Sequence, residues 1–152
     1  MAIILDGGAT TYASTFTASP TTARSITVPD ASFTLAGVDV AQSFTAAQRG
    51  AITALTDGAT ITPDFASANN FSVTLGGNRT MANPTNLTAG QSGSIFIVQD
   101  GTGSRTLAWG SYWDFTTGTA PTLTATASAI DRVDYIVRTT GSIHSVFTGD
   151  YS

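Results

Sequence analysis

The fold is decided by the stretch TITPDFASANNFSVTLGGNRTMANPTNLTAGQSGSIFIVQDGTGSRTLAWG, residues 60–110. In it, short apolar segments alternate with Gly, Asn and Asp, which are typical of tight turns. Residues 71–75, Phe-Ser-Val-Thr-Leu, alternate apolar and polar side chains and predict a strand with one buried face. Residues 94–98, Ser-Ile-Phe-Ile-Val, form a nearly continuous apolar run, which is typical of a central strand buried on both faces. The stretch therefore predicts a folding unit of strands and turns.

Similar patterns continue to the end of the chain. Val133, Tyr135 and Val137 alternate with more polar neighbours, and Thr140-Gly141 fits a short hairpin turn. The strands expected from these patterns are 59–62, 70–75, 93–99, 105–109, 122–124, 129–139 and 142–148. We expect residues 56–152 to form an all-β domain, an antiparallel β-sandwich or jelly roll.

Two further segments precede this domain. Residues 41–55 predict a short helical connector, because Ser43 can cap its start and Phe44, Ala47, Ala51 and Leu55 share one helical face. Residues 1–40 predict an extended N-terminal arm, rich in Thr, Ser and Ala, that orders best against another surface. The candidate attachment residues in this arm are its apolar side chains Ile3, Ile4, Leu5, Tyr12 and Phe16.

Composition excludes several classes of function. Only 11% of the 152 residues are charged, and Lys, Glu and Cys are absent. Lys and Glu are the main residues of exposed helix surfaces, so their absence favours β-structure. A net charge of −4 without a basic patch gives nucleic acid no binding surface. Without Cys there is no disulfide, thiolate catalysis or Cys-based metal site. No apolar run is long enough for membrane insertion.

Polar residues that could carry chemistry are weakly arranged. His144, the single histidine, has no nucleophile motif beside it, so a surface or structural role is favoured over a Ser-His-Asp triad. Asp131 and Asp134 could form a carboxylate pair, but three residues apart on a strand they point to opposite faces. Asp100 begins a Gly-rich segment that fits a hairpin turn better than a Ca²⁺ loop. We therefore expect no catalytic residue, cofactor or metal, and no enzyme activity.

An aromatic cluster is the most informative local feature. Trp109, Tyr112, Trp113 and Phe115 lie within seven residues of one another. Trp109 and Phe115 could plug the sandwich core while Tyr112 and Trp113 cover its end. Alternatively, the cluster could form a contact with a protein partner, or a platform on which a glycan ring stacks. The sequence leaves these three roles open.

Several separated segments, in order, resemble a module found at the C-terminal ends of tail-fibre and related appendage proteins of tailed bacteriophages and prophages. The resemblance covers about residues 40–152 and is carried by AQSFTAAQRGA (41–51), LTDGATI (55–61), LGGNRT (75–80), PTN (84–86), AGQSG (89–93), QDGTGSRT (99–106), APTL (120–123) and DRVDYIVR (131–138). Upstream, ITVPDASFTLA (26–36) resembles a short extended element of phage fibre chains.

The resemblance implies a structural virion protein that is a homo-oligomer, most often a trimer, and it brings no catalytic residue. Because the chain is short and lacks a long shaft, we expect a short head or tail fibre, a spike or a capsid decoration protein. Residues 1–40 would bind capsid or tail proteins, and the chain would be made in the host cytoplasm. The alternative is a host-attachment domain of the same virion, an adhesin that binds surface glycan through Tyr112, Trp113 and neighbouring loops.

Overall fold

The computed structural model describes residues 47–151. The chain divides into two units, Met1–Ser43 and Phe44–Ser152, and the described residues belong to the second. The predicted attachment arm, residues 1–40 with Ile3, Ile4, Leu5, Tyr12 and Phe16, lies outside the described residues.

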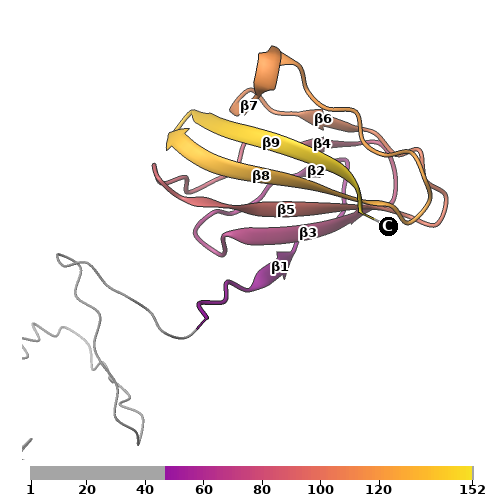
Figure 1. Ribbon diagram of the computed structural model, residues 1–152, viewed down its shortest axis with the longest axis horizontal. Helices are drawn as coiled ribbons and strands as arrows, with labels where there is room; N and C mark the ends of the chain where they lie inside the picture. The colour runs from indigo at the N-terminus through magenta and orange to yellow at the C-terminus, as the bar shows by residue number, and fades with distance from the viewer. Residues whose placement is uncertain (1–46, 152) are drawn as a thin grey trace, which may run out of the picture. The chain divides into compact units, whose positions relative to one another are not determined.

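Two sheets build the described part, and Figure 1 shows the strands of the smaller sheet behind those of the larger one. The larger sheet has six strands in the order β1-β3-β5-β8-β9-β7, and the smaller has three in the order β2-β4-β6. The strands are β1 (Ile52–Ala54), β2 (Thr60–Ile61), β3 (Asn70–Leu75), β4 (Arg79–Met81), β5 (Ser92–Gln99), β6 (Leu107–Trp109), β7 (Trp113–Phe115), β8 (Ile130–Thr139) and β9 (Ser142–Tyr151). The predicted all-β fold is confirmed.

From β1 to β6 the chain winds as a coil that crosses between the two sheets at each step. Successive strands in each sheet are parallel: β1, β3 and β5 in the larger, β2, β4 and β6 in the smaller. Asn70 lies beside Ile52, 18 residues earlier, and beside Ser94, 24 residues later. Because the turns of the coil differ in length, the winding leaves no repeat of fixed period in the sequence.

A hairpin closes the coil. Strand β8 pairs antiparallel with β5, β9 pairs antiparallel with β8, and β7 adds to β9 in parallel. The antiparallel sandwich predicted from the sequence is therefore wrong in strand direction, because five of the seven pairings are parallel. Alternating side chains show which face of a strand is buried, but they carry no information about the direction of its neighbour.

The predicted helix over residues 41–55 is wrong for the part that is described. Residues 47–51 are not helical, and Ile52–Ala54 pairs with β3 as β1. Pairing with an existing strand outweighs the modest helix preference of Ala-rich sequence. Within residues 47–151 the one helix is a 3₁₀ turn at Thr116–Gly118.

Strand boundaries match the sequence best where the apolar pattern is long. The predicted strands at 70–75, 93–99 and 129–139 correspond to β3, β5 and β8. Strands β4 and β7 were not predicted, and each has only three residues. Residues 122–124 form no strand; instead the backbone N–H of Thr124 donates to Asp131 Oδ2 at 2.8 Å.

Stacked aromatic rings join the coil to the hairpin inside the core. Phe65, in the turn after β2, stacks on Tyr135 of β8 at a centroid distance of 4.6 Å and on Phe71 of β3 at 5.7 Å. The Tyr135 hydroxyl donates to the carbonyl of Asn69 at 2.8 Å, and burial raises the pKa of this hydroxyl to about 12. The rings therefore fix the position of β8 relative to the first turns of the coil.

Gly93 lies where this junction is tightest, opposite Tyr135 on β5. A Cβ at this position would overlap the Asn69 carbonyl oxygen and crowd the Tyr135 hydroxyl. We expect Gly93→Ala to lower the free energy of unfolding by about 3 kcal/mol, because overpacking against backbone cannot relax. Denaturant unfolding checks this, with Gly101→Ala, which meets open space, as the matched control. Equal stability of the two variants would contradict the packing described here.

Candidate functional site

The outer face of the six-stranded sheet carries the exposed apolar surface of the described residues. Its large exposed side chains are Val146 (60% exposed), Ile52 (59%), Ile136 (49%) and Tyr151 (42%). Their neighbours on the same strands, such as Val137 and Ile143, are buried on the inner face. Soluble monomers seldom gather their exposed apolar side chains on one face, so this surface is the candidate functional site.

One cross-strand row shows how the fold builds this face. Ile52 of β1, Asn70 of β3, Ser94 of β5, Asp134 of β8 and Val146 of β9 lie side by side in register. The row has apolar side chains at both ends and polar side chains at its centre. Residues up to 94 positions apart in the sequence therefore meet on one surface, which no local motif could reveal.

The charged centre of the outer face is paired within the sheet. Asp134 Oδ2 lies 2.8 Å from Arg132 Nη2, and Asp134 Oδ1 accepts a hydrogen bond from Ser94 Oγ at 2.6 Å. The Arg132 guanidinium also lies 5.2 Å from the centre of the Tyr151 ring, within the range of a cation–π contact. Both Asp134 oxygens thus have partners, one from the neighbouring strand β5 and one from β8 itself.

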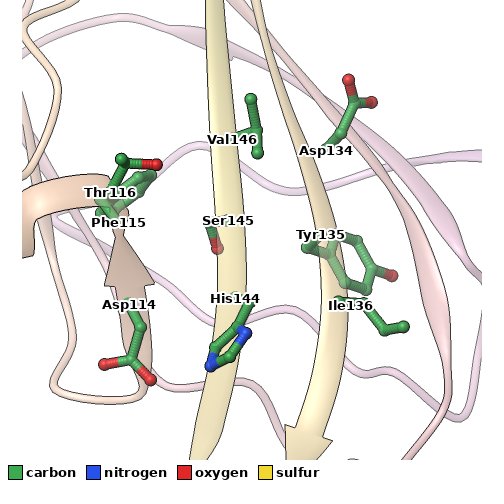
Figure 2. A pocket seen from close by; sticks show the side chains of 9 residues that line it. All are labelled: Asp114, Phe115, Thr116, Asp134, Tyr135, Ile136, His144, Ser145 and Val146. Carbon is green, nitrogen blue, oxygen red and sulfur yellow. The ribbon is translucent and has the colours of Figure 1, made fainter.

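An open groove of about 460 Å³ crosses this face over β7, β9 and β8. Figure 2 shows His144 on β9 with Asp114 of β7 on one side and Ile136 of β8 on the other. Asp114 Oδ2 accepts a hydrogen bond from Ser142 Oγ at 2.6 Å. Ser145 is buried and its hydroxyl donates to the Ile143 carbonyl at 3.3 Å, so it presents no nucleophile to His144.

The predicted aromatic contact residues divide between the core and its rim. Trp113 is 6% exposed, and its Nε1 donates to the Ala82 carbonyl at 3.0 Å. Trp109 contacts Trp113 edge-on at 5.2 Å and Phe115 at 4.9 Å, and all these rings pack against the core. Tyr112 is half-buried. The structure buries Trp113 in the core, whereas the sequence interpretation had placed it over the end of the core. Trp109, Tyr112 and Phe115 are partly buried against the core, and Phe115 also lines the groove.

The other acidic candidates hold loops and strands in place. Asp131 is buried, and its carboxylate accepts backbone hydrogen bonds from Thr124 and Asp150, whereas Asp134 is on the opposite face, as expected. Asp100 accepts hydrogen bonds from the backbone of Thr102 and Gly103, as a turn residue does.

Among residues 47–151, no three His, Asp, Glu or Cys side chains are grouped closely enough to hold a metal ion. No helix in this range is long and apolar enough to cross a membrane.

Residues 61–138, just over half of the chain, match the family described as "Putative phage tail fibre C-terminal domain". The chain belongs to this family of phage tail fibre C-terminal domains. The matched span runs from β2 to β8 and so contains most of the coil and the first strand of the hairpin. The resemblance found in the sequence is confirmed, and the chain is a phage structural fibre protein. No curated protein and no solved structure matches it.

The Asp100 turn of this fibre domain predicts a pH dependence. Bonding to the Arg105 guanidinium, followed by backbone N–H donors, lowers the pKa of Asp100 from 3.8 to about 2. A lowered pKa in the folded state contributes stability above about pH 4 that is lost as the pH falls toward 2. We expect Asp100→Asn to reduce the loss of stability over this window, as measured by denaturant unfolding at pH 2–6. Arg105→Gln should reduce it in the same way, and an unchanged pH profile in both variants would contradict the assigned cause.

Proposed function

We propose that the chain is the subunit of a short bacteriophage fibre, spike or decoration protein that assembles as a homotrimer. Residues 1–40 attach the subunit to capsid or tail proteins, and the domain built by β1–β9 projects from the particle. The observation that carries this proposal is the family match over the coil, together with the apolar outer face of the six-stranded sheet. The role is structural rather than catalytic.

Low charge supports a permanent assembly. Only 11% of residues are charged, and Lys and Glu, which interface cores disfavour, are absent. Burying Thr, Ser and Ala surfaces avoids the desolvation cost of unpaired charges. The three ion pairs of the described residues join Arg79 to Asp57, Arg105 to Asp100 and Arg132 to Asp134. Each of these pairs leaves a locally neutral surface.

Deleting residues 1–25 tests the attachment role. We expect the shortened chain to keep the unfolding transition and the oligomeric state of the full chain, since the described domain begins well after the deletion. We expect it to be absent from purified virions, as measured by immunoblotting particles grown with the deletion. A deletion that incorporates normally would contradict the attachment role, and one that fails to fold would assign residues 1–25 to the folded domain.

A second candidate function is glycan binding, because the groove on the outer face combines an aromatic ring with a carboxylate. Phe115, Asp114 and His144 line it, and sugar recognition commonly joins apolar stacking with carboxylate hydrogen bonds. If this function is correct, Asp114→Asn abolishes binding on a glycan array while the melting curve stays unchanged. Trp113→Ala is unsuitable as the main test, because loss of this buried ring should cost about 3–5 kcal/mol of stability. Absence of glycan binding by the wild-type oligomer would leave the structural role alone.

A further inference from the structure

We infer that the outer face of the six-stranded sheet is the surface through which copies of this chain pack together, with the same face of each copy directed toward the axis of the oligomer. The inference rests on the proposed homo-oligomeric function and deepens it by naming the surface. It rests on four observations: the apolar pattern of β5, the paired charges at the centre of the face, its charge balance and its area.

Strand β5 has the sequence of a strand covered on both faces. Ile95 and Ile97 are buried in the core, but Phe96 and Val98 lie on the outer face and are only half-buried. Continuous apolar runs are typical of strands with both faces covered. Within a single chain the inner face of β5 is fully covered and the outer face only in part, so the pattern is explained when another surface completes the cover over Phe96 and Val98.

The charged groups at the centre of the outer face already have ion-pair and hydrogen-bond partners within the subunit. Asp134 is bonded to Arg132 and Ser94, and the Arg132 guanidinium also lies over the Tyr151 ring. Burying a charge is costly when it loses its partner, but here both partners come from the same sheet. A covering surface can therefore be apolar without leaving Asp134 unpaired.

Charge balance permits a second copy as the occupant, and the proposed homo-oligomer supplies one. On β7 and β8 the outward Arg132 and Arg138 are matched by Asp114 and Asp134, so these side chains carry no net charge. Two copies of such a face meet without the repulsion that opposes association of like-charged surfaces. A strongly basic or acidic partner would gain nothing from this surface.

The area is sufficient for a stable contact. Six strands spaced at about 4.8 Å make the sheet roughly 24 Å wide, and the eight residues of β5 make it about 27 Å long. The resulting face of roughly 650 Å² is close to the ~800 Å² that each partner buries in a standard interface. Side chains projecting from the face add further area.

Sedimentation of the full chain at micromolar concentration tests the inference, with Val146→Asp as the disrupting variant and Ala108→Asp as the control. Ala108 is exposed on β6 in the smaller sheet, so its substitution adds the same charge elsewhere. We expect the wild type and Ala108→Asp to be oligomers. We expect Val146→Asp to associate at least about 30-fold more weakly, because the substitution places an unpaired carboxylate in the contact.

Because the chain has no Cys, single thiols give a second test that does not depend on a disruptive charge. In the assembled protein, the thiol of Val146→Cys should react slowly with a bulky maleimide, and that of Ala108→Cys should react rapidly. A monomeric wild type would overturn the proposed oligomeric function itself. An oligomeric wild type in which Val146→Asp assembles normally, or in which both thiols react at one rate, would overturn only the choice of this face.

Discussion

The structure depends on the stacking of Phe65 between the coil and the hairpin. Its ring contacts Tyr135 at 4.6 Å and Phe71 at 5.7 Å, and Trp113 meets Phe65 and Tyr135 edge-on at 6.3 Å. Such ring pairs contribute about 0.5–1.5 kcal/mol each beyond the area that they bury. They connect Phe65, in the turn after β2, to β3, β7 and β8. The Tyr135 hydroxyl adds the bond to Asn69, and only a glycine at position 93 leaves room for it.

This core buries the inner face of the larger sheet and thereby determines which side chains lie on its outer face. With Ile95, Ile97 and Val133 directed inward, the alternation of the strands must direct Phe96 and Ile136 outward. The outward residues include the apolar Phe96, Val98, Ile136 and Val146 beside the paired Arg132 and Asp134. We propose that the fibre assembles through this face, which the same strands present when they close the fold of one subunit.

The sequence predicted the parts that local pattern controls. Long alternating segments at 70–75 and 129–139 identified β3 and β8, because the hydrophobic period specifies a half-buried strand. Strand direction was not predictable, since the coil's crossings between sheets leave no repeat. The helix predicted over 41–55 was wrong in its described part, residues 47–55, because pairing of β1 with β3 is a tertiary effect. The outer face was missed as a site because its residues come from separate strands, although the apolar run at 94–98 already carried the signal.

A parallel coil closed by a hairpin leaves the larger sheet exposed, and we propose that the fibre assembles through this sheet. An electron cryomicroscopy map of the assembled fibre that resolves individual sheets would show whether it does. We expect the six-stranded sheets of neighbouring subunits to face one another around the fibre axis, with Val146 and Ile136 between them and the three-stranded sheets toward solvent. A map with the six-stranded sheets facing solvent and the β2-β4-β6 sheets in contact would rule out this arrangement.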